Sequence, residues 1–215
     1  MGLIRLLLSA PQLFLLLTVP LLYSVIAHEV AHGLCAGLFG DDTAKRHGRL
    51  TLNPLRHLDP IGTLMLFLAG FGWARPVPVN YANLRPARLG LFCVALAGCA
   101  TNILIASIAI FAQQGRLVVA DSILAVVLQI VARINIALGA FNLIPIPPLD
   151  GSKILMSFLP DEAQRSLAGF GRYGLLILML LLFTGRLNPL IALMERLIYG
   201  VLGLLFGLNS PKHAC

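Results

Sequence analysis

The stretch "LLYSVIAHEVAHGLCAGLFG", residues 21–40, carries ionisable side chains inside an apolar run that begins near Leu13. His28, Glu29 and His32 form the pattern HExxH. Residues i and i+4 share one face of a helix. Both histidines can therefore bind one Zn²⁺, with Glu29 beside them to take a proton from a zinc-bound water. The alternative is a pair of histidines bonded to neighbouring helices. Ionisable groups in a membrane span are costly and usually functional, which favours the metal site.

The composition indicates a membrane protein. Hydrophobic residues make up 58% of the 215 positions, charged residues only 12%, and the mean hydropathy is +0.89. A soluble domain is about a quarter charged, so this chain has too little charge for a surface that mostly faces water. The net charge of +7 does not indicate a nucleic-acid partner, because the Lys and Arg residues gather in loops between apolar runs. The expected surroundings are the lipid bilayer.

Several apolar runs approach the length of about 20 residues that a membrane-spanning helix needs. They cover residues 13–38, 89–112, 122–146, 170–185 and 188–207. The run from Ile61 to Trp73 is too short to cross unaided and is expected to be re-entrant. We predict an all-α polytopic membrane protein with about five to six transmembrane helices and a short re-entrant segment. Residues 1–215 are expected to form one membrane-embedded domain.

Two segments between the first spans differ in composition from the apolar runs. Residues 46–54 and 74–81 are rich in Thr, Val and Pro and alternate partially, which predicts a small β-hairpin or sheet. Their prolines confine such strands to edge positions. With five crossings, most Lys and Arg residues lie on the same side as these segments. The positive-inside rule places that side in the cytoplasm, so the sheet would lie near the cytoplasmic mouth of the site.

Two histidines do not complete a catalytic zinc site, which keeps three protein ligands. His47 and His57 lie in a charged loop, and His213 lies in the tail. The cysteines form no CxxC pair, so a thiolate site is not expected. Asp150 follows the third long apolar run in "FNLIPIPPLDG" (141–151), where prolines break the helix, as is tolerated beside a polar cavity. An Asp at a Pro-rich turn is also a common helix cap, so its role stays open at this point.

Two motifs taken together resemble the site-2 protease family of intramembrane zinc metalloproteases. That family has HExxH on one membrane helix and N-x-x-P-x-x-P-L-D-G on a later one. Here they read "HEVAH" (28–32) and "NLIPIPPLDG" (142–151). The stretches "NPLRHLDPIG" (53–62) and "GFGWARPVPVN" (70–80) also match. The core motifs therefore cover about residues 21–152.

The resemblance implies a ligand set. His28, His32 and Asp150 would hold one Zn²⁺ per chain, and Glu29 would be the general base. Asn142 matches the family's polar residue eight positions before the ligand Asp, where a carboxamide could hold the scissile carbonyl or the oxyanion.

Two further polar residues lie within expected spans. Asn102, in "AGCATN" (97–102), resembles the end of an AGPxxN element, but Cys99 replaces the Pro. Hydrogen bonding between helices suits Asn102 equally well. Arg133 needs a partner or water. The C-terminal helices over residues 170–207 lie outside the matched motifs.

The expected function is that of an intramembrane zinc endopeptidase, which cleaves a transmembrane segment of a membrane-protein substrate. The expected location is the plasma membrane of a prokaryote, with the active site open to the cytoplasm. One alternative is an inactive zinc-binding protein that captures transmembrane helices, although such a protein would not need Glu29. The other is a metal transporter, although the paired halves common in transporters are not visible in the sequence.

Overall fold

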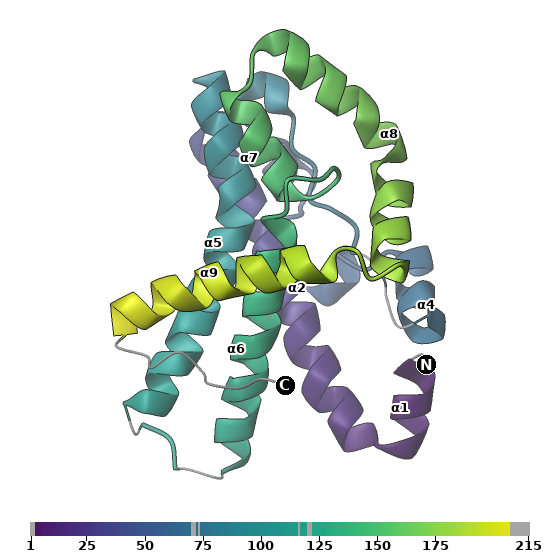
Figure 1. Ribbon diagram of the computed structural model, residues 1–215, viewed down its shortest axis with the longest axis vertical. Helices are drawn as coiled ribbons and strands as arrows, with labels where there is room; N and C mark the ends of the chain where they lie inside the picture. Colours follow the sequence, from purple (N-terminus) through teal and green to yellow (C-terminus); the bar gives the residue numbers. More distant parts are fainter. Residues whose placement is uncertain (1–2, 70–71, 73, 116, 120–121, 207–215) are drawn as a thin grey trace.

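The computed structural model describes residues 3–69, 72, 74–115, 117–119 and 122–206. Trp73, Arg116, His213 and Cys215 lie outside these residues. Every regular element within them is helical (Figure 1). The α-helices are α1 (Leu3–Ser9), α2 (Pro11–Leu38), α3 (Thr43–Arg46), α4 (Pro60–Ala69), α5 (Ala87–Gln114), α6 (Ile123–Asn142), α7 (Asp150–Phe158), α8 (Asp161–Phe183) and α9 (Asn188–Phe206). Two short 3₁₀ turns, η1 (Pro54–Arg56) and η2 (Tyr81–Asn83), lie in the loops.

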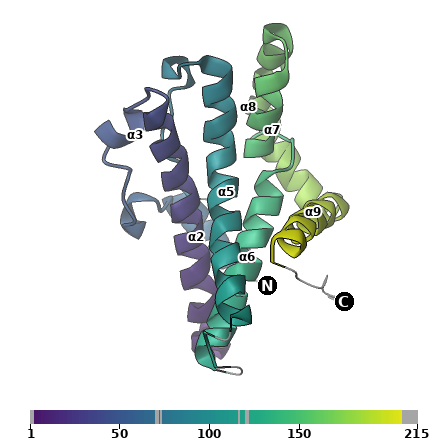
Figure 2. The same ribbon diagram turned by 90° about the vertical axis from the view of Figure 1, so that its left-hand side faces the viewer.

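Three long helices, α2, α5 and α6, stand side by side and form the centre of the molecule (Figure 2). A row of buried residues at four-residue spacing explains how α5 packs between its neighbours. This row consists of Gly90, Val94, Gly98, Asn102 and Ala106. Small side chains at this spacing allow helix backbones to approach closely in a membrane, where the hydrophobic effect does not draw helices together. Gly98 of this row therefore brings α5 close to the HExxH helix, while Gly90 packs against Leu84 and Phe39.

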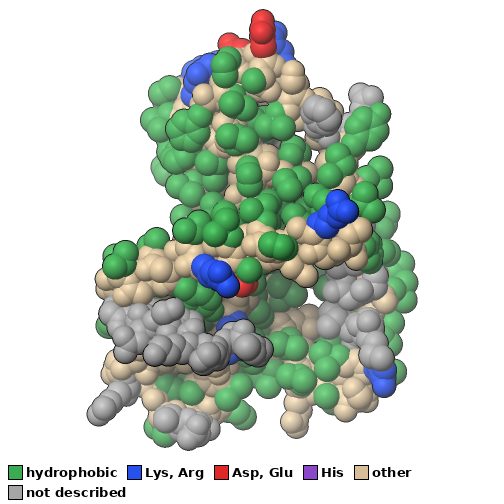
Figure 3. All heavy atoms as spheres, viewed as in Figure 1, with side chains coloured by type: hydrophobic (Ala, Val, Ile, Leu, Met, Phe, Trp, Pro, Cys, Tyr) green, Lys and Arg blue, Asp and Glu red, His purple; other side chains and the backbone are tan. Residues whose placement is uncertain are grey.

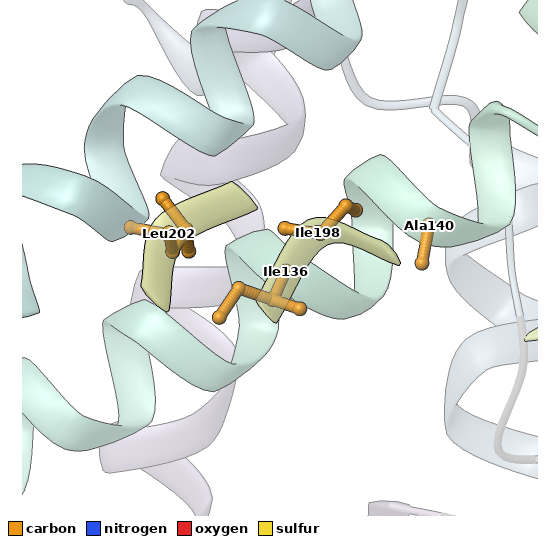
Figure 4. Close-up of a cluster of buried hydrophobic side chains, with 5 residues drawn as sticks. Ile136, Ala140, Ile198 and Leu202 are labelled. Atoms are coloured by element: carbon orange, nitrogen blue, oxygen red, sulfur yellow. The ribbon is translucent and has the colours of Figure 1, made fainter. Parts of the chain in front are cut away.

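The helix α9 packs across α6 instead of running along it (Figure 1). Ile198 and Leu202 of α9 lie against Ile136 and Ala140 of α6 in a buried apolar cluster (Figure 4). Ala106 of α5 completes this cluster. The helix α9 thus covers part of α6, while α1 and α3 contact α2.

Among the described residues, four helices are long and apolar enough to cross a membrane: α2, α5, α6 and the part of α9 from Asn188 to Leu205. The helix α8 adds a fifth if its two parts, bent by 67° to each other, form one broken span. The described part of the chain therefore has four to five candidate spans, a range that meets the expected five to six at five. The helix α4 has 10 residues, about 15 Å of helix, and cannot cross a hydrocarbon core of about 30 Å.

The expected β-hairpin is not formed in the described part of the chain. The one β contact there is an isolated antiparallel bridge between Leu58 and Ala74. Pro76 and Pro78 have no N–H to offer a neighbouring strand, and the N–H of Val77 donates to a side chain of α2. Apart from that bridge at Ala74, residues 74–80 run as an extended segment without strand pairing, which we call the strap.

The outer surface fits a bilayer. Large apolar side chains are exposed along the long helices, for example Leu104 and Ile108 on α5 and Leu176 and Leu180 on α8. One face of the molecule is mostly hydrophobic, and its acidic side chains show mainly at the end where α7 meets α8 (Figure 3). Such an apolar surface would be unfavourable in contact with water. The chain is an integral membrane protein.

Candidate metal centre

The two histidines of HExxH lie together on α2 and are both buried. Their Nε2 atoms are 3.0 Å apart. Because α2 continues unbroken through this region, the four-residue spacing alone brings both rings to one face of the helix. That face is turned toward α5 and the start of α7.

Asp150 is the first residue of α7, and its carboxylate lies next to both histidines. Its Oδ2 atom lies 3.0 Å from the Nε2 atom of His28 and 3.0 Å from that of His32. The turn after α6 makes this approach possible, because Gly151 packs directly on the end of that helix. A Cβ atom at Gly151 would lie 2.2 Å from the carbonyl oxygen of Leu143. The "LDG" sequence thus requires a glycine after the carboxylate for steric reasons.

The outer ring nitrogens of both histidines have acceptor partners. The Nδ1 atom of His28 lies 2.6 Å from Oδ1 of Asn102, and that of His32 lies 2.6 Å from the carbonyl oxygen of Val94. A carbonyl can only accept, so each Nδ1 carries the proton and donates it. Each Nε2 is then left with a lone pair that points inward, as in the second shell of metal sites.

This arrangement fits a bound cation. Two Nε2 lone pairs and an ionised carboxylate oxygen converge, and these ligand atoms all lie within 4.8 Å of one another. One proton can bridge only one pair of these acceptors, whereas a metal ion can bind all three. Three ligands held at about 2.0–2.1 Å in tetrahedral geometry lie about 3.3–3.4 Å apart, close to the 3.0 Å spacing found here.

Lys153, one turn after Asp150 on α7, contacts the same carboxylate. Its Nζ atom donates to Oδ1 of Asp150 at 2.9 Å, which leaves Oδ2 facing the histidines. Burial favours the neutral acid, but the charge of Lys153 and its hydrogen bond favour the ionised carboxylate that a metal ligand needs. In the sequence, Lys153 is one of the loop charges that indicate the membrane topology. No pattern there indicates that it contacts the site.

Glu29 lies beside the histidines and is held by the strap. Its Oε2 atom accepts a hydrogen bond of 2.8 Å from the N–H of Val77. Glu29, the three candidate ligands and Asn142 all line one cavity of about 150 Å³. One N–H of the Asn142 amide donates to the carbonyl of Leu138 at 3.0 Å. The amide group has a second N–H that this bond does not use.

Three residues that shape this geometry were not identified from the sequence: Gly98, Asn135 and Ser24. Gly98 lets α5 approach the rings, because a Cβ atom there would lie 2.5 Å from Cε1 of His28. Asn135 of α6 accepts from the Asn102 amide at 2.8 Å and donates to the Ser24 hydroxyl at 2.8 Å. A buried asparagine in an apolar helix is the one sequence signal that could have indicated this network.

The other histidines considered as ligands lie in loops. Within the described residues, His47 bonds to the carbonyl of Thr43, and His57 bonds to that of Thr51. Neither belongs to the group of side chains that could share a metal ion. Asn102 forms hydrogen bonds between helices, which was one of its two expected roles. Its amide donates to Asn135 of α6, and its carbonyl oxygen lies against Nδ1 of His28 on α2. Arg133 is exposed on α6.

Comparison with known proteins relates the chain to zinc metalloproteases. The sequence profile described as "Peptidase family M50" matches residues 112–184, which include Asp150. "Putative zinc metalloprotease YwhC" of Bacillus subtilis is 40% identical over 175 residues, which cover 78% of this chain and 80% of that protein. "Putative zinc metalloprotease Rip2" of Mycolicibacterium smegmatis is 31% identical and covers 84% and 71%.

The Rip2 protein of Mycobacterium tuberculosis is also 31% identical, over 89% of this chain and 73% of its own length. No solved structure shows a significant match. The sequence resemblance to the site-2 proteases is thus confirmed, and the names of these relatives agree with a zinc-dependent hydrolase. The chain belongs to peptidase family M50 and is a zinc metalloprotease.

Proposed function

We propose that the chain is an intramembrane endopeptidase that cleaves a peptide bond within a transmembrane segment of a membrane-protein substrate. The observation that carries the proposal is the convergence of His28, His32 and Asp150 next to Glu29, on one small cavity between apolar helices. The helices that carry these residues expose large apolar side chains on their outer faces, so lipid surrounds the site laterally. A substrate that is itself a membrane helix reaches this depth directly.

In this proposal His28, His32 and Asp150 hold the zinc ion. Zinc bound there supplies the Lewis acidity that makes a water nucleophilic near neutral pH and polarises a carbonyl. Glu29 accepts the proton of the attacking water and returns it to the amine that leaves. The bond from Val77 to Oε2 of Glu29 fixes one carboxylate oxygen and leaves the other free for this transfer.

The cavity limits what can react. A volume of about 150 Å³ accommodates a short extended piece of chain but not a helix, since a helix with its side chains is about 10–12 Å wide. The substrate must therefore unwind near the scissile bond. Asn142 lines the cavity, and its unused N–H is suited to donate to the scissile carbonyl or the oxyanion.

The test compares wild-type protein with Glu29→Gln. Each is expressed with a panel of single-span membrane proteins, and cleavage is followed on immunoblots while zinc is measured on purified protein. Wild type should hold about one zinc per chain and cleave at least one substrate. Glu29→Gln should keep its zinc and lose cleavage by several orders of magnitude. Cleavage by the variant at the wild-type rate would refute the mechanism, and zinc transport without cleavage would favour the transporter alternative.

We further propose that the chain lies in a bacterial plasma membrane with its active site open to the cytoplasm. The relatives above are bacterial, and the Lys- and Arg-rich loops predict which side faces inward. Single cysteines at Lys45 and Arg85, in a background without the native cysteines, should react with an impermeant thiol reagent only after cells are opened. A cysteine at Arg116 should react in intact cells. Reaction of all three from one side would contradict this topology.

A further inference from the structure

A second cavity, of about 570 Å³, lies on the other side of the strap from the metal centre. It is lined by four basic residues together with one leucine and two prolines of the loops. These residues are His47, Arg49, Arg56, Arg75, Leu55, Pro76 and Pro78. Pro76 also lines the cavity of the metal centre, so the strap is the wall between the two. No acidic residue lines this second cavity, which we call the basic cavity.

The positive charge of the basic cavity is not neutralised by ion pairs. None of Arg49, Arg56 and Arg75 forms a salt bridge within the described residues. Arg49 is 8% exposed, and its Nη2 atom donates to the carbonyl of Arg75. Its Nε atom is buried without any hydrogen-bond partner. Burial lowers the pKa of Arg49, and the charges of Arg75 and Arg56 act in the same direction, while Glu29 opposes them.

A buried, unpaired guanidinium beside two others is unfavourable unless an anion joins it. Guanidinium groups match phosphate oxygens with paired N–H bonds, and the volume exceeds what one phosphate group needs. We propose that the basic cavity binds a phosphate-bearing anion, and that the headgroup of an anionic phospholipid supplies it.

The apolar surroundings favour a lipid as the source. Leu55 lines the cavity and is 80% exposed. Pro60 then begins the apolar helix α4, on which Ile61, Leu64 and Leu68 are also exposed. A basic cavity next to exposed apolar side chains matches a phospholipid, whose phosphate and acyl chains adjoin. The proposed cytoplasmic position of this loop places it at the leaflet that is rich in anionic lipid.

Occupancy of the basic cavity also bears on the metal centre, and this step rests on the proposed function. The Arg49 side chain donates a hydrogen bond to the carbonyl of Arg75. Two residues later, the N–H of Val77 donates to the Glu29 carboxylate. An anion that neutralises the repulsion between the arginines keeps this part of the strap in place. Glu29 then stays oriented, so anionic lipid should activate cleavage.

The binding test uses the purified full chain in nanodiscs or detergent, with native mass spectrometry as the readout. The lipid probes are phosphatidylglycerol and phosphatidylcholine. The pocket variant Arg56→Gln/Arg75→Gln changes two exposed residues of the cavity. The control variant Lys45→Gln/Arg46→Gln removes the same charge from the neighbouring helix α3, outside the cavity.

Wild type should prefer phosphatidylglycerol. The pocket variant should weaken its binding by at least about tenfold, the loss expected for charge-assisted hydrogen bonds, and the control by less than about twofold. Equal binding of both lipids, or equal weakening by both variants, would overturn the proposal. Displacement of the lipid by millimolar inorganic phosphate would overturn the lipid as the source. Tighter binding of an acidic peptide would favour a protein partner instead.

Zinc content and cleavage separate this proposal from the proposed function. The pocket variant should keep its zinc, because it leaves the three candidate ligands in place. Its cleavage should fall and should no longer respond to phosphatidylglycerol, whereas the control variant should respond as wild type does. If wild type cleaves nothing, the proposed function fails while the lipid measurements still decide the basic cavity. If cleavage responds to the lipid equally in all three proteins, the coupling through the strap is wrong.

Discussion

The change Asn102→Leu tests whether the buried polar network positions the metal centre. Leucine has the same branched shape as asparagine, although it is larger, and it cannot accept the proton on Nδ1 of His28, which lies 2.6 Å from the amide oxygen. It also removes the donor to Oδ1 of Asn135. No cavity is created, so the expected effect comes from the lost hydrogen bonds and from the larger volume of leucine at a buried position.

The structure determines which way these amides face. The Nδ2 atom of Asn135 lies 2.8 Å from the carbonyl oxygen of Val131, which can only accept, so this end of the amide must be the donor. Oδ1 of Asn135 must then accept, and Asn102 must present its NH₂ group there. Oδ1 of Asn102 is thus left to accept from His28. This chain of constraints selects the His28 tautomer whose Nε2 is free to bind metal.

Loss of such an outer-shell partner costs about 10- to 100-fold in metal affinity, equal to about 1.4–2.7 kcal/mol. Zinc affinity is measured by competition with a chromophoric chelator on purified protein. Asn102→Asp keeps an acceptor for His28 and should bind zinc more tightly than Asn102→Leu. Ser107→Ala, which removes a hydroxyl bonded to the carbonyl of Ile103 on the same helix, should leave zinc affinity unchanged. A folded Asn102→Leu protein with wild-type zinc affinity would refute the positioning role.

Three further changes test the site and its support. Asp150→Ala should lose zinc and cleavage together, and full zinc retention would remove this carboxylate from the ligand set. Gly98→Ala places a Cβ atom 2.6 Å from Nε2 of both His28 and His32, so zinc content should fall even though alanine is the better helix former; normal zinc content would show that α5 can shift. Asp41 is buried and ionised, and its pKa is lowered because hydrogen bonds from the neighbouring loops outweigh burial. The stability it contributes is complete above its unfolded pKa of about 4 and is lost as the pH falls through the lower folded value. Asp41→Asn should therefore lower the melting temperature at pH 7, with a difference from wild type that shrinks below about pH 4; a difference independent of pH would contradict this charge effect.

Local and periodic features of the chain were sufficient to predict the membrane helices and the pairing of the two histidines in the site. Hydropathy over about 20 residues depends on nothing outside the window, so α2, α5 and α6 were placed within a few residues of their bounds. The shortness of the run that became α4 was equally clear. His28 and His32 meet because helix geometry alone relates positions four apart.

The features that failed or were missed depend on partners distant in the sequence. Strands at 46–54 and 74–81 were predicted from composition, but a strand needs a neighbour to accept its N–H groups. In the folded chain the N–H of Val77 bonds to Glu29 instead. Asp150 could be predicted as a candidate ligand only through its family motif, since an Asp at a Pro-rich turn is also a common helix cap.

Only the tertiary structure decided what surrounds the three candidate ligands. Gly98 is one small residue among many in an apolar helix until α5 lies against the rings of α2. Lys153 reads as a loop charge until the first turn of α7 brings it to Asp150. Hydrogen bonds and steric contacts act over a few ångströms, and which side chains come that close is set by how helices pack, which no local pattern specifies.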